Sequence, residues 1–319
     1  MKQVKIAIVG AGYMASEHTK AFSGLPGVNL VGITSRTRAR AEKLAVEYPG
    51  MKVFDSVEEL YRETQADLVI ITVKEMSMAQ VATECFRFPW AALLEKPAGY
   101  DLANAQLILE EARKNSRRVW VALNRRAYSS TRQVLARLEG STSPRYIRVL
   151  DQQDQVTARD IYKEPPEVVR NYMYANSIHL IDYFRVFGRG EVTHITPISP
   201  WTPDAPWMVV AKLEFSSGDL GIYEAVWNGP GPWTVTVVTP EQRLEMRPLE
   251  QASLQLRGER KVTQLEISTD DSQFKPGLRQ QARDVLAAIA GLESPIPSLE
   301  DSFASMRLVA GIFGLVGKV

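Results

Sequence analysis

Val4-Lys5-Ile6-Ala7-Ile8-Val9-Gly10-Ala11-Gly12-Tyr13-Met14-Ala15 is the stretch that decides the fold. Its first part is rich in β-branched residues and ends at a glycine, which is typical of a buried strand. Gly10 permits a tight turn, Gly12 lets the backbone approach a pyrophosphate, and the small Ala15 allows helix and strand to pack closely. The free N–H groups of the helix that follows would face the phosphate charge. The stretch therefore predicts a dinucleotide site built as strand, turn and helix.

The composition is that of an ordinary globular protein. A chain of 319 residues exceeds what a single core usually supports, so two domains are expected. A net charge of +1, without a basic block, argues against nucleic acid or an anionic membrane as a partner. The lone Cys85 excludes an internal disulfide, no signal-peptide pattern precedes the first strand, and the apolar stretch Leu308–Val316 is too short to span a membrane. We expect a soluble, cytoplasmic protein.

Strands and helices alternate over the first 122 residues. The apolar run Asp67–Val73 is typical of a parallel strand that is buried on both faces. Other strands are predicted at 4–9, 28–33, 91–94 and 119–123, and helices at 38–47, 78–86 and 101–115, with a capping box at Ser56–Glu59. This alternation predicts a doubly wound parallel sheet, a Rossmann domain, over residues 1–122.

The regular alternation of strands and helices stops after residue 122, and we expect residues 123–319 to form a second, α/β domain. Strands without helices between them are predicted at 192–198, 208–215, 220–227, 234–238, 243–247 and 261–267, after a strand at 145–150. Their alternating polarity suits an antiparallel sheet with unlike faces. Helices are predicted at 130–138, 177–187, 278–290 and 299–316, and the last two could pack back toward the N-terminal domain.

Five short motifs follow one another along the chain in an order that is typical of one protein family. They are the opening fingerprint with His18 downstream, Glu95-Lys96-Pro97, Asn124-Arg125-Arg126, His179 with Asp182, and a closing pattern around Gln280-Gln281 and Asp301–Ser305. In this order they resemble the Gfo/Idh/MocA family of NAD(P)-dependent oxidoreductases over nearly the whole length. The resemblance implies a Rossmann domain plus an α/β domain with an open, mainly antiparallel sheet that often mediates dimers or tetramers. It also implies reversible hydride transfer at a hydroxyl-bearing carbon, commonly of a sugar, cyclitol or nucleotide sugar.

Lys96 and His179 are the catalytic candidates. Lys96 follows an apolar strand at the carboxyl edge of the sheet, where it could bond both the nicotinamide ribose and the reacting oxygen. A solvated surface lysine is the alternative, which the Glu-Lys-Pro context disfavours; in that motif Pro97 is expected to be cis. We place His179 in the first turn of a helix capped by Asn176, where the helix dipole would keep it neutral for proton exchange. A packed core histidine is its alternative.

Ala175 departs from the family pattern. Many members carry an aspartate four residues before this histidine, and alanine cannot shuttle a proton. Three possibilities stay open: Asn176 or Tyr174 takes the positioning role, His179 acts alone with Lys96, or the site no longer turns over. In the last case the chain would be a dinucleotide-binding scaffold or sensor. A further alternative keeps the fold but uses the cofactor transiently, as in family-like glycosidases or oxidoreductases that never release it.

The end of the second strand bears on cofactor choice. NAD-selective sites usually place a carboxylate there, whereas this chain has Ser35, Arg36 and Thr37, which could hold a 2′-phosphate. We therefore expect NADP(H) to be preferred, with NAD(H) possible; the alternative is a solvated helix start. The remaining predicted cofactor contacts are Gly10, Gly12, Tyr13, Met14, Thr72, Glu95, Lys96 and Asn124.

Substrate contacts are predicted from the position of polar side chains after the last Rossmann strand and before His179. Arg126 and Tyr128 follow the last Rossmann strand and could meet an anionic or sugar-like substrate, although domain-joining salt bridges are an equal alternative for the arginine. The other predicted substrate contacts are Lys96, Tyr174, Asn176 and His179. The three histidines lie far apart in sequence, so no metal site is expected. We expect a homodimer or homotetramer formed through the C-terminal sheet.

Overall fold

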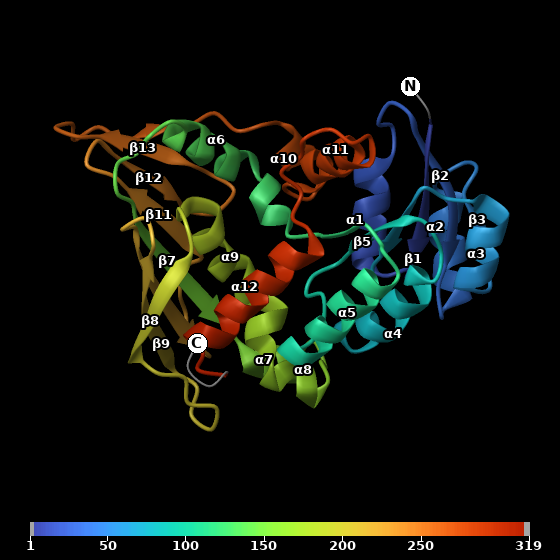
Figure 1. Ribbon diagram of the computed structural model, residues 1–319, viewed down its shortest axis with the longest axis horizontal. Coiled ribbons are helices and arrows are strands. Elements are labelled where there is room, and N and C mark those ends of the chain that lie inside the picture. The colour runs from blue at the N-terminus through green and yellow to red at the C-terminus, as the bar shows by residue number, and fades with distance from the viewer. Residues whose placement is uncertain (1–2, 316–319) are drawn as a thin grey trace. The chain divides into compact units, whose positions relative to one another are not determined.

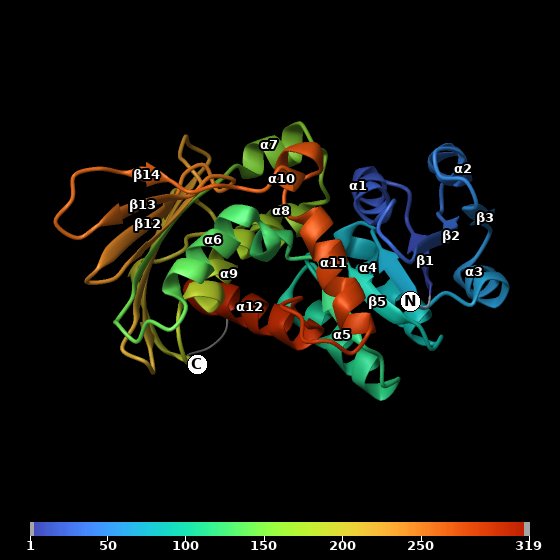
Figure 2. The same cartoon turned by 90° about the horizontal axis from the view of Figure 1, so that it is seen from above.

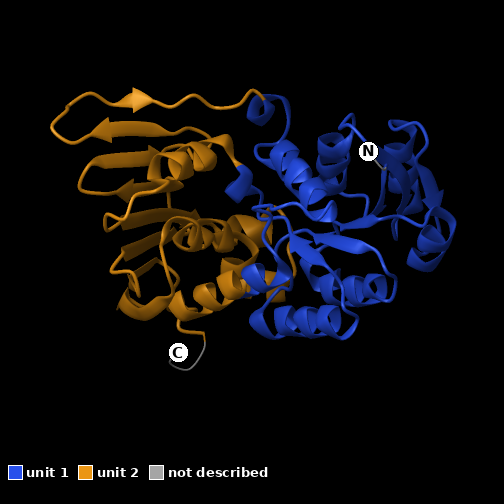
Figure 3. Ribbon diagram, turned by 45° about the horizontal axis from the view of Figure 1, so that its top comes forward, with its two compact units in different colours: residues 1–127, 270–303 blue, residues 128–269, 304–319 orange. Residues whose placement is uncertain are grey.

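The chain forms two compact units (Figure 3) in a computed structural model that describes residues 3–315. Unit 1 holds the described residues up to Ala127 together with Asp270–Phe303. Unit 2 holds Tyr128–Thr269 and the described residues from Ala304 onward. The polypeptide therefore leaves unit 1 after Ala127 and returns to it at Asp270.

Unit 1 is built on a six-stranded sheet with the order β3-β2-β1-β4-β5-β6, in which all five neighbouring pairs are parallel. The direction of strand order reverses between β1 and β4, which is the arrangement of a doubly wound fold and confirms the predicted fold class. The strand β3 was not anticipated, because its three residues are partly exposed and carry no long apolar run. The strands are β1 Val4–Val9, β2 Val28–Thr34, β3 Lys52–Phe54, β4 Leu68–Ile71, β5 Ala91–Leu94 and β6 Val119–Val121.

Helices connect these strands (Figure 1), and a late helix completes the core. Leu278, Ala282 and Val285 of α11 pack in one apolar cluster with Ile6 and Ile8 of β1, so the returning segment shares the Rossmann core. The helices of unit 1 are α1 Tyr13–Phe22, α2 Arg38–Val46, α3 Val57–Thr64, α4 Glu75–Phe86, α5 Leu102–Lys114, η1 Asn124–Ala127, α10 Asp270–Gln273 and α11 Leu278–Ile289.

The capping box that the sequence predicts is present with one change of partner. The Ser56 hydroxyl accepts a hydrogen bond from the backbone N–H of Glu59 at 3.0 Å, which satisfies a free donor at the start of α3. The Glu59 carboxylate accepts from the backbone N–H of Asp55, at 2.8 Å, instead of that of the serine. Both bonds fix the entry into α3 after the short strand β3.

Unit 2 contains an eight-stranded sheet with the order β14-β13-β12-β11-β7-β10-β9-β8. Its only parallel pair is β7 with β10, and the other pairs are antiparallel, as predicted. The predicted strand at 261–267 shortens to β14, and β13 was not predicted. The strands are β7 Tyr146–Gln153, β8 Val192–Ser199, β9 Met208–Phe215, β10 Leu220–Trp227, β11 Thr234–Val238, β12 Gln242–Met246, β13 Ser253–Leu256 and β14 Thr263–Gln264.

Helices α6 and α9 lie against one face of this sheet, as Figure 2 shows. The helical segments here are α6 Ser129–Leu138, α7 Gln155–Asp160, α8 Pro166–Arg170, the π-helical turn η2 Met173–Ser177 and α9 Ile178–Phe187. The last helix, α12 Leu299–Ile312, contributes residues to both units. The predicted helix ran to Val316, which lies outside the described residues. Between residues 3 and 315, no helix is long and apolar enough to cross a membrane.

Candidate active site

The glycine turn leaves room for a ligand at one position and not at the other. Gly10 has φ +106°, and a Cβ on it would lie 2.8 Å from Oγ1 and 2.9 Å from the carbonyl oxygen of Thr72. Only glycine therefore suits this position. A Cβ on Gly12, which precedes α1, would meet no atom within 4 Å. The open space beside Gly12 and the start of α1, which has no side-chain cap, fits the phosphates of a dinucleotide.

The end of β2 carries no carboxylate. Ser35 is half-buried and its hydroxyl accepts from the backbone N–H of Thr37 at 3.3 Å, while Arg36 and Thr37 are exposed. Arg38 is held in ion pairs with Glu42 and Asp55. Arg36 makes no ion pair with any residue that the structure describes, so its guanidinium is available for an anionic ligand at this sheet edge.

Lys96 directly follows Glu95 at the end of β5, and its peptide bond to Pro97 is cis, as expected. Burial lowers the pKa of the Lys96 ammonium below its ordinary value. The carboxylates of Glu95 and Glu75 oppose this effect, whereas the positive charges of Arg125 and Lys275 add to it. A lysine with a lowered pKa gives up and regains a proton at lower pH than a solvated one, which suits acid–base chemistry.

A buried hydrogen bond connects the helix after the glycine turn with the residue before Lys96. His18 Nε2 on α1 lies 2.7 Å from Glu95 Oε1, and their side chains are 1% and 9% exposed. The other carboxylate oxygen, Oε2, accepts from the backbone N–H of Lys96 at 3.1 Å. These contacts give Glu95 a structural role that positions Lys96, while the contact with cofactor predicted for it stays a prediction.

The remaining cofactor candidates of unit 1 lie near the same carboxyl edge of the sheet. Thr72 follows β4, and its hydroxyl donates to the carbonyl of Val9 at 3.2 Å. Asn124 lies just after β6, is 7% exposed, and donates from Nδ2 to the carbonyl of Pro276 at 2.9 Å. Tyr13 and Met14 are the first two residues of α1. Tyr13 is 66% exposed, and the Lys275 ammonium lies over its ring. The predicted substrate contact Arg126, in η1, is half-buried.

The candidates of unit 2 gather on η2 and α9. His179 is 7% exposed, and Tyr174, Ala175 and Tyr128, the last of which precedes α6, are likewise buried. The expectation that Asn176 caps the helix is wrong, because the π-helical turn η2 begins at Met173 and continues directly into α9. His179 therefore lies within a continuous helical segment and not beside a free helix N-terminus, so the dipole argument for its neutrality does not apply.

Two buried polar residues near this turn escaped the sequence reasoning. Asp151 and Gln153 lie on β7 and are 2% and 1% exposed. Their positions continue the inward-facing alternation of Ile147 and Val149, so a carboxylate and an amide occupy places where an apolar residue is usual. Polar residues at inward-facing strand positions were the signal that could have found them.

Asp182 and the tryptophans serve packing in unit 2. Ser305 donates from its hydroxyl to Asp182 Oδ1 at 2.5 Å, which holds α9 to the C-terminal segment. Trp227 is fully buried, and its ring centroid lies 4.5 Å from that of Trp201 and 5.7 Å from that of Phe313. The half-buried Trp201 thus packs against the buried Trp227 and serves the core of unit 2.

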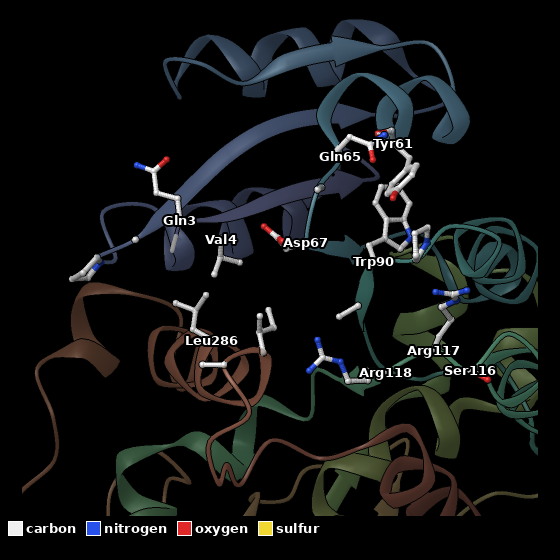
Figure 4. Close-up of a pocket in the computed structure, with 17 residues that line it drawn as sticks. Gln3, Val4, Tyr61, Gln65, Asp67, Trp90, Ser116, Arg117, Arg118 and Leu286 are labelled. Carbon is white, nitrogen blue, oxygen red and sulfur yellow. The ribbon is translucent and has the colours of Figure 1, made fainter. Parts of the chain in front are cut away.

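A groove of about 610 Å³ opens at the opposite ends of the Rossmann strands (Figure 4). Gln3, Asp67, Trp90 and Arg118, among its lining residues, each immediately precede a strand. Ligands in such folds bind beyond the carboxyl ends of the strands, where Gly10, Thr72 and Lys96 lie, so this groove is separate from the candidate active site. Over residues 3–315 no group of three or more metal-binding side chains occurs.

Comparison with known proteins agrees with the fold and the motifs. The family profile described as "Oxidoreductase family, NAD-binding Rossmann fold" (GFO_IDH_MocA) matches residues 4–123. The myo-inositol 2-dehydrogenase of Thermotoga maritima is 24% identical over 239 residues, which are 69% of this chain and 68% of that protein. The inositol 2-dehydrogenase of Salmonella typhimurium is 27% identical over 36% of this chain and 35% of its own length.

Solved structures share the fold over nearly the full length. A dehydrogenase from Chromobacterium violaceum aligns with a TM-score of 0.82 at 16% identity, covering 99% of this chain and 95% of its own. UDP-N-acetylglucosamine 3-dehydrogenase from Acidithiobacillus ferrooxidans aligns with a TM-score of 0.77 at 18% identity, covering 99% and 98%. With the glycine turn, the Glu-Lys-Pro motif and the two sheets in place, residues 4–123 match the NAD-binding Rossmann domain of the Gfo/Idh/MocA oxidoreductase family.

Proposed function

We propose that this oxidoreductase prefers NADP(H) and transfers a hydride to or from a hydroxyl or keto carbon of a sugar or nucleotide sugar. The observation that carries the proposal is Lys96, a half-buried lysine with a lowered pKa that follows β5 at the carboxyl edge of the sheet. That edge also carries the open glycine turn. A proton-exchanging cation near a dinucleotide site suits the interconversion of an alcohol and a ketone.

The proposed catalytic roles follow from side-chain chemistry. When bound, the dinucleotide supplies or accepts the hydride. Lys96 would hold the reacting oxygen and stabilise its alkoxide character, and His179 would take the hydroxyl proton during oxidation or return it during reduction. The predicted substrate contacts Arg126, Tyr128 and Tyr174 stay predictions.

The preference for NADP(H) is supported by the end of β2. An exposed Arg36 that makes no ion pair among the described residues, beside the hydroxyls of Ser35 and Thr37, offers charge and hydrogen-bond donors to a 2′-phosphate. We expect Arg36→Ala to weaken NADPH binding about tenfold or more and to change NADH binding less than about twofold, measured by quenching of protein fluorescence. Arg40→Ala is the matched control from the same exposed helix start, and it should change neither affinity. Equal losses for both cofactors in Arg36→Ala would contradict the preference.

A catalytically altered scaffold or sensor is the second candidate, and Ala175 is the observation that favours it. Alanine offers no proton-transferring group at that buried position. Steady-state assays with NADP⁺ and NAD⁺ over a panel of myo-inositol, aldoses and UDP-N-acetylglucosamine distinguish the oxidoreductase from the scaffold or sensor. Turnover supports the oxidoreductase proposal, whereas tight NADPH binding without turnover over the whole panel would favour the scaffold. The first and third members of the panel are taken from the names of the similar proteins.

We also infer that the chain forms a homodimer or homotetramer through the sheet of unit 2. Successive residues of β9 and β10 alternate between buried and half-buried, so one face of the sheet is less covered than the other. That face mixes apolar side chains, such as Val210 and Ile222, with the Arg148–Glu224 ion pair. A second copy of the sheet would cover it with like chemistry. The cytoplasmic location expected from the sequence stays a prediction.

A further inference from the structure

A buried polar chain runs through unit 2 toward the turn that precedes α9. Asp151 and Gln153 share one face of β7, because residues two apart on a strand point the same way. Both side chains are almost fully buried, and groups of this kind are stable in a protein interior only when they are hydrogen-bonded.

Each member of the chain is bonded to the next. Asp151 accepts on Oδ2 from the Tyr223 phenol at 2.7 Å and on Oδ1 from Gln153 Nε2 at 2.7 Å. Gln153 Oε1 in turn accepts from Asn176 Nδ2 at 2.8 Å. Burial, and after it the charge of Asp151, raises the pKa of Tyr223 well above its ordinary value, so the phenol keeps the proton that it donates.

The carboxylate sets the direction of every bond in this chain. A carboxylate only accepts hydrogen bonds, so Gln153 must turn its NH₂ group toward Asp151 and its carbonyl oxygen toward Asn176. Asn176 must then turn its own NH₂ group toward Gln153. The amide oxygen of Asn176 is left as the acceptor at the half-buried end of the chain, and this orientation follows from the network itself.

We propose that Asp151 is a positioning residue that acts through Gln153 to hold the Asn176 amide with its oxygen presented to a hydroxyl donor of the substrate. Asn176 precedes His179 by less than one helical turn and adjoins Ala175, in the turn where the sequence lacks an acidic group. The proposal rests on the proposed function for its substrate, but the bond directions among Asp151, Gln153 and Asn176 do not depend on it.

Paired substitutions test the bond directions without any substrate. In Asn176→Asp, two carboxylates compete for the single NH₂ group of Gln153, so Tm should fall by about 6 °C. In Asp151→Asn alone, the amides can still pair, and Tm should fall by about 3 °C. In the double variant Gln153 can reverse, donating to the new carboxylate at position 176 and accepting from the new amide at position 151, which satisfies every group again. We therefore expect the double variant to lose at least about 4 °C less than the sum of the single losses.

The kinetic readout tests the role of the outward acceptor. With the panel substrate that the wild type turns over best, Asp151→Asn should raise KM about fivefold with kcat changed less than about twofold, because Asn176 no longer has a fixed orientation. The double variant should bring KM back to within about twofold of the wild type, since the carboxylate at position 176 again offers an acceptor. Tyr223→Phe is the matched control: it removes one bond to Asp151 but leaves the Gln153 contact, so it should lower Tm without changing KM.

Two results would overturn the proposal: additive Tm losses in the double variant, or a KM in the double variant no better than in Asp151→Asn alone. A wild type that binds NADPH but turns over no panel member would defeat the proposed function instead. In that case the Tm comparison still decides whether Asp151 orients Asn176. NADPH affinity, which depends on unit 1, should be the same in the wild type and in every variant, and it reports that unit 1 of each variant is folded.

Discussion

At the scale of single residues, the two positions of the opening turn require glycine for different physical reasons. Gly10 is required by the protein itself, because its positive φ and the nearby Thr72 leave no room for a side chain. Gly12 has empty space where a Cβ would lie, so nothing in the folded chain requires it. Its requirement must come from a ligand, which is the role that the GxGxxA pattern predicts.

The two glycines therefore predict opposite phenotypes. Gly12→Ala should keep Tm within about 2 °C of the wild type and weaken NADPH binding at least about tenfold, because the methyl group occupies the space for the phosphates. Gly10→Ala should lower Tm by about 5 °C or more, because it adds strain and a clash. Differential scanning fluorimetry with and without NADPH measures both effects. A Gly12→Ala protein with normal NADPH affinity would contradict the placement of the dinucleotide.

Lys96 makes a prediction about pH. Because Arg125 adds to the lowering of the Lys96 pKa and Glu75 opposes it, the two neighbours should move that pKa in opposite directions. Arg125→Gln should raise it and shift the Lys96 limb of the kcat/KM profile to higher pH by about half a unit. Glu75→Gln should shift the same limb to lower pH by a similar amount. If the limb of the kcat/KM profile shifts in the same direction in both variants, or in neither, then Lys96 is not the group that titrates.

At the scale of elements, a buried carboxylate holds the turn between β9 and β10. Asp219 is fully buried and accepts four hydrogen bonds: from the backbone N–H groups of Arg145 and Arg189 at 2.8 and 3.0 Å, and from the Arg189 guanidinium at 2.6 and 3.0 Å. Burial alone would raise the pKa of Asp219, but the bonds from Arg189 and Arg145 outweigh it and lower that pKa. The carboxylate is thus more stable charged in the folded state than in the unfolded chain.

We expect Asp219→Asn to reduce the free energy of unfolding at pH 7 by about 3 kcal/mol, because it leaves a partly buried arginine without its counter-charge. The pKa of Asp219 in the folded state lies below its unfolded value of about 3.9. The extra free energy of unfolding of the wild type is therefore complete above about pH 3.9, and it is lost as the pH falls through the folded pKa of Asp219. Urea denaturation at pH 7 and pH 3 measures both. Asp160→Asn, which removes an exposed pair with Arg159, should change stability little at either pH. A pH-independent difference for Asp219→Asn would contradict the assignment.

Elements with strong periodic signals were predictable and short or irregular ones were not. The buried strand β4 and the capped helix α3 follow from an apolar run and a Ser-Glu capping pattern. The strand β3 has three residues, too few for a periodic pattern, and it exists because a neighbouring strand offers backbone partners. The strand predicted at 261–267 shortens to the two residues of β14, which are the ones that pair with β13. The π-helical turn η2 likewise follows no residue signal, and it removed the helix N-terminus that was expected beside His179.

At the scale of the whole molecule, unit 1 is discontinuous in sequence. Segment Asp270–Phe303 belongs to it because Leu278, Ala282 and Val285 pack into the core of the Rossmann sheet. The expected boundary at residue 122 follows from a change in the pattern of strands and helices, and the sequence indicated a return only as terminal helices that could pack back toward the N-terminal domain. Apolar residues on a helix show that the helix packs on something, but not on what.

The fold class, the dinucleotide turn and the family resemblance of residues 4–123 were predictable from the sequence, because they depend on local patterns: β-branched runs, spaced glycines and short motifs whose neighbours in sequence are also neighbours in space. The tertiary structure adds that α11 completes the first core, that His18 bonds Glu95, and that Asp151 reaches Asn176 through Gln153. These contacts join residues far apart in the chain. Hydrogen bonds and packing depend on distance in space, which no local pattern specifies.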